Sequence, residues 1–225
     1  DGLKLESFEV DRASFRQAVE EVPRKLLDAF ELATRRINEF ARASLPKTWH
    51  DKDSGLGEMV VPMDRVGVYA PGGTAVYPST ILMAVGVARA IGVKEIILCT
   101  PLRDNASSNS LILAAAQIAG VDRVFRIGGA QAVAAMAYGT ESIPPVDKVC
   151  GPGNVFVTLA KQQLFGQVGI DGIFGPTETV VVADQWADPK LCAADLLAQA
   201  EHDLMASPIL ITTSEKMSKE VQDEI

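Results

Sequence analysis

Short apolar runs alternate with alanine-rich segments from residue 58 onward, and this alternation limits the fold more than any other feature. The strand-like runs are 58–62, 65–69, 95–100, 123–127, 148–150, 179–183 and 209–212. Helical segments lie between most of them, at 79–91, 108–119, 130–138, 154–165 and 189–205. Continuous apolar strands between helices are typical of a parallel sheet covered on both faces. The sequence therefore predicts an α/β fold with a doubly wound, Rossmann-like parallel sheet.

This pattern divides the chain into three regions. Residues 1–66 are expected to form a helical arm and a lead-in strand, because apolar residues such as Phe15, Val19 and Leu26 recur there at helical spacing. A polar stretch at 46–57 is expected to be a loop. Residues 67–175 then form the Rossmann-like unit. Residues 176–225 begin a second α/β unit, which stops inside a predicted helix and is expected to be incomplete.

Charge and cysteine content exclude several partners and favour a cytoplasmic location. The net charge is −8 and no basic run is present, so nucleic acid and acidic membrane surfaces are not expected partners. No apolar run reaches membrane-spanning length. Cys99, Cys150 and Cys192 form no Cys-x-x-Cys pair, which fits reduced thiols in a cytoplasmic protein.

Four glycine-rich loops follow predicted strands, where open α/β sheets bind their ligands. They lie at 69–73, 128–131, 151–154 and 175–178. Glycine allows close approach of the backbone, and the N–H groups of the following helix favour anions. Any one loop could be only a tight turn, whereas four of them favour a nucleotide. The usual Gly-x-Gly-x-x-Gly pattern is absent, so NAD would bind by an atypical route.

A possible metal pair lies near the end of the last long predicted helix. Gln199 and His202 are three residues apart and therefore share one helix face. A neutral imidazole is a common metal ligand, and an amide offers an oxygen beside it. By spacing alone, however, most such pairs are solvated surface.

Six stretches resemble histidinol dehydrogenases. They begin at Tyr69, Gly128, Gly139, Gly151, Gly175 and Gln199 and stand in the family's order. The resemblance implies a zinc- and NAD-dependent oxidation of L-histidinol to L-histidine through L-histidinal, in histidine biosynthesis. It also implies a cytoplasmic homodimer whose sites are shared between subunits.

The same resemblance assigns roles to individual residues. It places Tyr69, Gln131 and Asn154 at NAD-contacting positions. Two zinc ligands that also approach the substrate correspond to Gln199 and His202. Thr177 stands where the family usually has a substrate-contacting serine. Family members continue for about as many residues again, and that part holds the catalytic Glu-His pair and the other zinc ligands. The resemblance thus implies an amino-terminal fragment without catalytic residues and without activity of its own.

Two other interpretations remain open at this stage. In a thiol-dependent aldehyde dehydrogenase, Cys150 beside a glycine-rich loop would form a hemithioacetal. No neighbouring His or Lys in sequence lowers the pKa of this thiol, however. Alternatively, the loops and the amphipathic arm would suffice for a non-catalytic nucleotide-binding or dimerisation module.

Overall fold

The computed structural model describes residues 7–72, 76–102, 106–174, 178–201 and 205–225. It contains two compact units, Asp1–Phe174 and Gly175–Ile225, and each is described by itself. Among the described residues, no helix is both long and apolar enough to cross a membrane.

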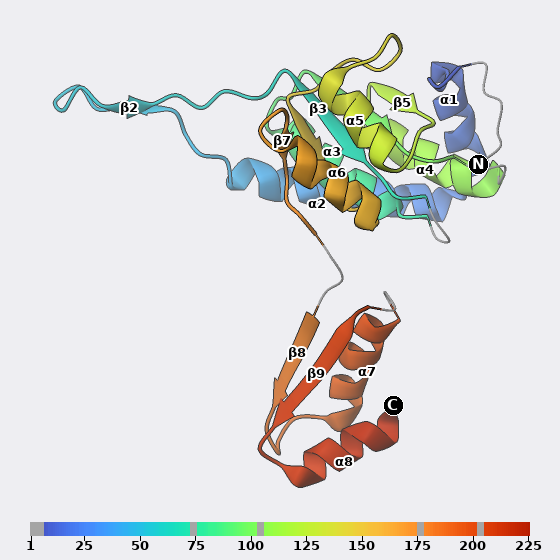
Figure 1. Ribbon diagram of the computed structural model, residues 1–225, viewed down its shortest axis with the longest axis vertical. Coiled ribbons are helices and arrows are strands. Elements are labelled where there is room, and N and C mark those ends of the chain that lie inside the picture. Colours follow the sequence, from blue (N-terminus) through green and yellow to red (C-terminus); the bar gives the residue numbers. More distant parts are fainter. Residues whose placement is uncertain (1–6, 73–75, 103–105, 175–177, 202–204) are drawn as a thin grey trace. The chain divides into compact units, whose positions relative to one another are not determined.

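The first unit is built on a five-stranded parallel sheet (Figure 1). Its strands are β3 (Arg65–Tyr69), β4 (Glu95–Cys99), β5 (Arg123–Phe125), β6 (Lys148–Cys150) and β7 (Gly169–Ile170). Their order is β5-β4-β3-β6-β7, so the first strand of the sheet is central and the chain winds outward in both directions. This is the strand order of a doubly wound Rossmann-like sheet. The predicted fold class is therefore confirmed.

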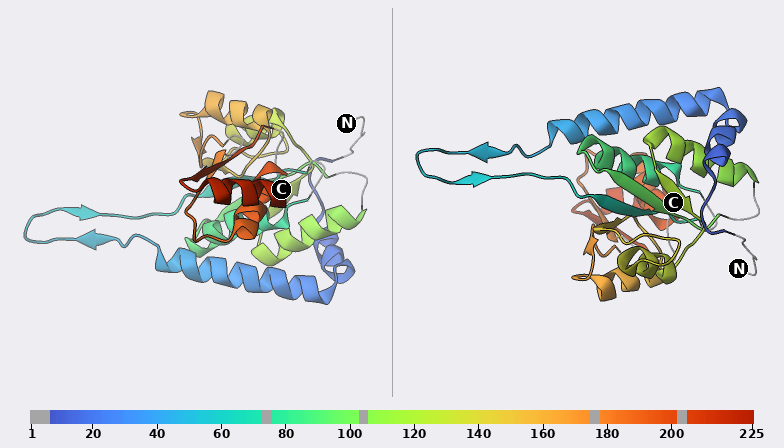
Figure 2. Two further views of the ribbon diagram at one scale, coloured as in Figure 1. Left: turned by 90° about the horizontal axis from the view of Figure 1, so that it is seen from below. Right: turned by 90° about the horizontal axis from the view of Figure 1, so that it is seen from above.

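Helices cover both faces of this sheet (Figure 2). One face is covered by α3 (Pro78–Ala90) and α4 (Ala106–Ala119), and α1 (Arg12–Glu21) and α2 (Arg24–Ala43) pack in turn on these two helices. The other face packs against α5 (Ala130–Tyr138) and α6 (Val155–Leu164). Strand residues alternate between the two cores: Val66 and Val68 face the first, and Tyr69 faces the second. Both faces are buried, which explains the continuous apolar strands of the sequence.

The structure differs from the prediction at 46–62, where the sequence predicts a loop (46–57) followed by a strand (58–62). Two short strands, β1 (Trp49–His50) and β2 (Gly57–Glu58), pair antiparallel in a hairpin that projects from the first unit (Figure 1). The indole N–H of Trp49 donates to the Glu58 carboxylate at 3.2 Å across the hairpin. Residues 59–62 form no strand of the main sheet.

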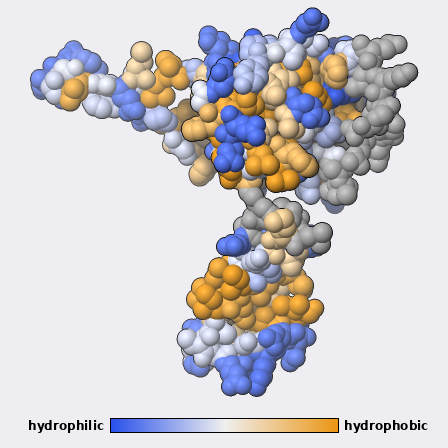
Figure 3. All heavy atoms as spheres, viewed as in Figure 1, coloured by the Kyte–Doolittle hydropathy of each residue, from blue (hydrophilic) through white to orange (hydrophobic). Residues whose placement is uncertain are grey.

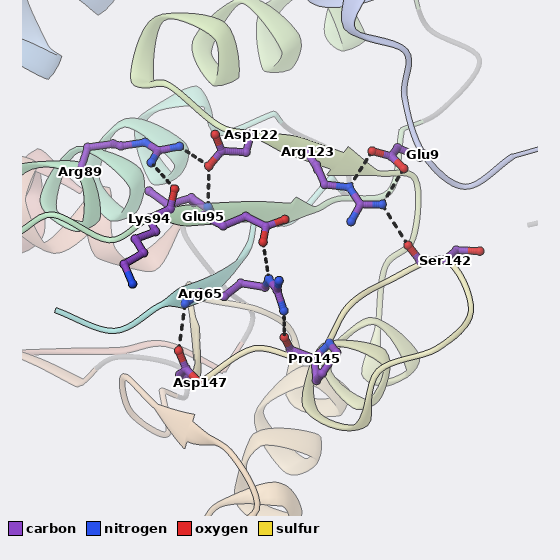
Figure 4. Close-up of polar contacts among 11 residues, drawn as sticks. Glu9, Arg65, Arg89, Lys94, Glu95, Asp122, Arg123, Ser142, Pro145 and Asp147 are labelled. Atoms are coloured by element: carbon purple, nitrogen blue, oxygen red, sulfur yellow. Dashed lines mark hydrogen bonds and ion pairs between the residues drawn. The ribbon is translucent and has the colours of Figure 1, made fainter.

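Charged side chains join the strands at the amino edge of the sheet (Figure 4). The Arg65 guanidinium donates to Glu95 at 2.6 Å and to the Pro145 carbonyl at 2.8 Å, and its backbone N–H donates to Asp147 at 2.9 Å. A hollow of about 600 Å³ lies here, lined by Asp64, Arg65, Lys94, Glu95, Pro145, Val146 and Asp147. Its cations and carboxylates pair with each other, so we interpret this edge as structural.

The second unit is a small parallel βαβ structure followed by a helix. Its elements are β8 (Glu178–Ala183), α7 (Pro189–Ala200), β9 (Ser207–Thr212) and α8 (Glu215–Glu224). One face of the two strands packs on the helices through Ala183 and Leu210. The opposite face is exposed and apolar (Figure 3), and its side chains are Val180, Val182, Ile209 and Ile211. The expected incompleteness of this second unit stays a prediction.

Candidate functional site

The candidate site lies at the carboxyl edge of the first unit, between β3 and β6. These strands are neighbours in the sheet, but the chain leaves them in opposite directions. The helix after β3 covers one face, and the helix after β6 covers the other. Loops that diverge in this way create the crevice in which doubly wound folds bind ligands.

Tyr69, the last residue of β3, connects two of the predicted loops. Its hydroxyl accepts a hydrogen bond from the Gly129 N–H at 3.1 Å. Gly151 packs closely against the backbone of Tyr69, because a Cβ added to Gly151 would lie 2.0 Å from the Tyr69 carbonyl oxygen. The tyrosine is only 4% exposed, and burial raises its pKa, so the phenol is neutral. One buried residue therefore sets the position of both the 128–131 and 151–154 loops.

Gln131 and Asn154 lie at the starts of the two helices on the same face of the sheet. The Gln131 side chain folds beside Gly129, where an added Cβ would lie 2.9 Å from its Oε1. Asn154 caps α6, with its Oδ1 accepting from the N–H groups of Phe156 at 3.1 Å and Val157 at 3.2 Å. Both residues are exposed. The structure brings Gln131 near Tyr69, and it joins Asn154 to Tyr69 through the loop that begins at Gly151.

Two glycines predicted to let a ligand approach are needed for packing between loops. A Cβ on Gly72 would lie 2.4 Å from the Pro101 carbonyl oxygen, and one on Gly128 would lie 2.8 Å from the Pro101 Cβ. The loops after β3 and β5 thus meet on the loop after β4. Close approach of backbone to backbone is a sufficient reason for glycine at these positions.

A buried lysine of α6, which the sequence interpretation missed, reaches this site. Lys161 is 2% exposed. Its ammonium donates to the Gly151 carbonyl and, at 2.6 Å, to the Asp171 carboxylate. A signal for it exists in the sequence, because Lys161 shares the apolar stripe of its helix with Val157 and Leu164. A cation within such a stripe needs a buried partner.

The predicted metal and substrate residues are only partly described. Gln199 lies in the last turn of α7 and is half-buried, whereas Thr177 and His202 lie outside the described residues. Among the residues that are described, no group of three His, Cys, Asp or Glu side chains could hold a metal. An amide oxygen and an imidazole nitrogen are donors that zinc accepts, but they make up half of its usual ligand set of about four.

The cysteines of the sheet are poor nucleophiles. Burial raises the pKa of Cys99 to about 12. Burial, assisted by the nearby Asp171 carboxylate, raises the pKa of Cys150 to about 11. The thiolate, which is the reactive form, is therefore scarce at neutral pH. This weighs against the thiol-dependent aldehyde dehydrogenase interpretation.

We expect both thiols to resist modification in the folded chain. At pH 8, Cys99 and Cys150 should react with a thiol reagent at least about 100-fold more slowly than in the urea-unfolded chain, because their thiolate fractions are suppressed. Site-resolved mass spectrometry of the labelled protein measures both rates. Rapid labelling of native Cys150 would restore it as a candidate nucleophile.

Comparison with known proteins identifies the family. The sequence model described as histidinol dehydrogenase matches residues 1–225. The chain belongs to the histidinol dehydrogenase family. The histidinol dehydrogenase of Dehalococcoides mccartyi strain CBDB1 is 53% identical over 99% of the chain and 51% of its own length. That of Methanosarcina mazei is 48% identical over 100% of the chain and 53% of its own length. The chain thus spans about half the length of these relatives.

Solved structures agree with this assignment. The crystal structure of histidinol dehydrogenase from Elizabethkingia anophelis is 36% identical, with a TM-score of 0.90 over 98% of this chain and 52% of its own. An engineered glycolyl-CoA reductase with bound NADP+ is 17% identical, with a TM-score of 0.53 over 94% of this chain and 54% of its own. The second likeness concerns the fold alone.

Proposed function

We propose that this chain supplies the NAD-binding part and two zinc ligands of a histidinol dehydrogenase. The enzyme would oxidise L-histidinol to L-histidine through L-histidinal. Family membership supports oxidation in histidine biosynthesis. The observation that carries the cofactor assignment is the junction at Tyr69, whose hydroxyl and carbonyl hold two loops at the switch point of a Rossmann-like sheet.

In this proposal the chain positions the cofactor, and NAD, when bound, supplies the hydride acceptor. Tyr69 fixes the 128–131 loop from within the core, so that Gln131 presents its amide at the exposed start of α5. The Asn154 oxygen is used in capping α6, which leaves the side-chain N–H₂ group as its donor for a ligand. A rigid arrangement of this kind lowers the entropic cost of holding the nicotinamide against the alcohol carbon.

Gln199 and His202 would hold zinc and substrate, and Thr177 would contact the substrate through its hydroxyl. Two protein ligands leave zinc mostly to water. We therefore propose that these 225 residues by themselves neither hold zinc tightly nor turn over histidinol. A cytoplasmic homodimer is part of the same proposal and is supported by the family resemblance alone.

The test is removal of one oxygen atom from Tyr69 in a full-length family protein that carries this sequence. In Tyr69→Phe the half-buried Gly129 N–H loses its acceptor, at a cost of up to about 1–3 kcal/mol. We expect the Michaelis constant for NAD to rise by about tenfold or more, which corresponds to about 1.4 kcal/mol. The Michaelis constant for histidinol should change less than twofold. Histidinol-dependent NADH formation measures both constants.

The matched control is Tyr138→Phe, because Tyr138 is 63% exposed at the end of α5. It should leave both constants unchanged. A larger effect of Tyr69→Phe on histidinol than on NAD would assign Tyr69 to the substrate side. If the full-length protein forms no NADH but binds NAD, the non-catalytic nucleotide-binding module becomes the better interpretation.

A further inference from the structure

The backbone of Gly151 is held on both sides by one buried ion pair. The Lys161 ammonium donates to its carbonyl oxygen. The Asp171 carboxylate accepts from its N–H at 2.6 Å, and the other carboxylate oxygen accepts from Lys161 at 2.6 Å. Gly151 has a φ of 111°, in the region that favours glycine. Two charged side chains therefore fix a residue that would otherwise be among the least restricted of the loop.

The pair also ties the loop to its surroundings. Asp171 follows β7, and Lys161 lies in the middle of α6, so the loop after β6 is joined to the next strand and to its own helix. The Phe174 ring lies 5.5 Å from the Lys161 nitrogen. Thr158 of α6 donates to the Phe174 carbonyl at 2.8 Å. The held glycine in turn packs against the carbonyl of Tyr69.

Lys161 is not placed to bind a ligand itself. An ammonium has three N–H donors, and this one contacts the Gly151 carbonyl, the Asp171 carboxylate and the face of Phe174. With 2% of its side chain exposed, it has no surface to offer. A buried ion pair is also weak evidence for stability, since apolar residues of the same volume often serve as well. Unlike apolar residues, the pair forms hydrogen bonds with both the N–H and the carbonyl of Gly151.

We propose that Lys161 and Asp171 are positioning residues, which hold the 151–154 loop in the shape that receives the dinucleotide. This inference rests on the proposed function. It assigns to the NAD site two further residues that do not contact the ligand. Without the pair, Gly151 would lose its fixed conformation, and Asn154 would lose its fixed distance from Tyr69. A misplacement of about 1 Å at such a site costs up to about 100-fold in function.

The experiment removes both charges together, because removing Asp171 alone would leave the Lys161 ammonium buried and unpaired. We compare the 225-residue chain with Lys161→Met/Asp171→Asn. The control is Lys94→Met/Asp64→Asn, which removes an ion pair of the same type and similar length (2.7 Å) whose side chains are 76% and 78% exposed at the opposite edge of the sheet. Lys161→Met alone, which leaves the Asp171 carboxylate with 24% of its side chain exposed, decides the question if the double variant does not fold.

Two quantities are measured for each folded variant: the dissociation constant for NAD+ and the exchange rate of the Gly151 and Asn154 amide protons. We expect the pair variant to bind NAD+ at least about tenfold more weakly and to exchange the Gly151 amide proton faster. The control should change neither quantity. Affinity within twofold of the unsubstituted chain, or unchanged exchange at Gly151, would overturn the inference. If the unsubstituted chain binds no NAD+, the proposed function fails, and the exchange rates still decide whether the pair holds the loop.

Discussion

Replacing Gly151 by alanine should lower the free energy of unfolding by about 2–5 kcal/mol and abolish NAD binding. Its φ of 111° is unfavourable for any residue with a Cβ, and that Cβ would lie 2.0 Å from the carbonyl oxygen of Tyr69. The contact is between backbone atoms of a loop and a central strand, so no side-chain rotation relieves it. Chemical denaturation and NAD+ titration of the folded variant measure the two effects.

Gly166→Ala separates the steric contact from the backbone conformation. Gly166 has a φ of 99°, but an added Cβ would meet nothing within 4 Å. This variant should lose only about 1–2 kcal/mol, the cost of the left-handed conformation, and should keep its affinity for NAD+. Equal losses in the two variants would mean that Gly151 is required for its φ alone and that its packing on Tyr69 is unimportant.

The bare face of β8 and β9 should make the chain self-associate. Val182 is 77% exposed and Ile211 is 53% exposed on a two-stranded sheet whose helices cover only the other face. Contiguous exposed apolar surface of this kind promotes association. We expect concentration-dependent association in sedimentation experiments. Val182→Thr/Ile211→Thr, which keeps β-branched side chains, should weaken it by about tenfold or more.

The control for this experiment is a pair of exposed apolar residues elsewhere. Leu56 is 64% exposed and Met59 is 78% exposed, just before and just after β2 of the projecting hairpin. Leu56→Thr/Met59→Thr should leave the association unchanged. A monomeric parent chain at high concentration would contradict the prediction. If only the hairpin variant loses self-association, the contact between chains lies on the hairpin and not on β8 and β9.

The strand–helix alternation was enough to predict four of the five strands of the main sheet, because a strand buried on both faces must be apolar throughout. It missed the two-residue strand β7 (Gly169–Ile170). The same signal failed at 59–62, where apolar residues flank a hairpin. The apolar pattern indicates that a segment could form a strand, but not which segment it will pair with. Here the residues just before 59–62 pair within the hairpin, as β1 with β2. Gly92, Gly120 and Gly139 follow the ends of α3, α4 and α5 and all have positive φ, as is common after a helix C-terminus.

The site was predictable to a smaller extent. Three of the glycine-rich loops follow β3, β5 and β6 of one parallel sheet, so their position at one edge follows from the topology. The fourth, at 175–178, belongs to the second unit. Nothing in the sequence shows that the Tyr69 hydroxyl would accept from Gly129, or that Gly72 and Gly128 would both pack on Pro101. The Lys161–Asp171 contact with Gly151 depends on how α6 and the end of β7 meet, which is a tertiary property.

The most direct test of the central claim is to map NAD+ binding onto the backbone amides of this chain by NMR. If the loops at the carboxyl edge form the cofactor site, the signals of Gly129, Gln131 and Asn154 should shift with saturation. Those of Glu95 and Asp147, at the amino edge, should remain unchanged. Saturable shifts confined to the amino edge, or none in the 128–131 and 151–154 loops, would contradict the assignment.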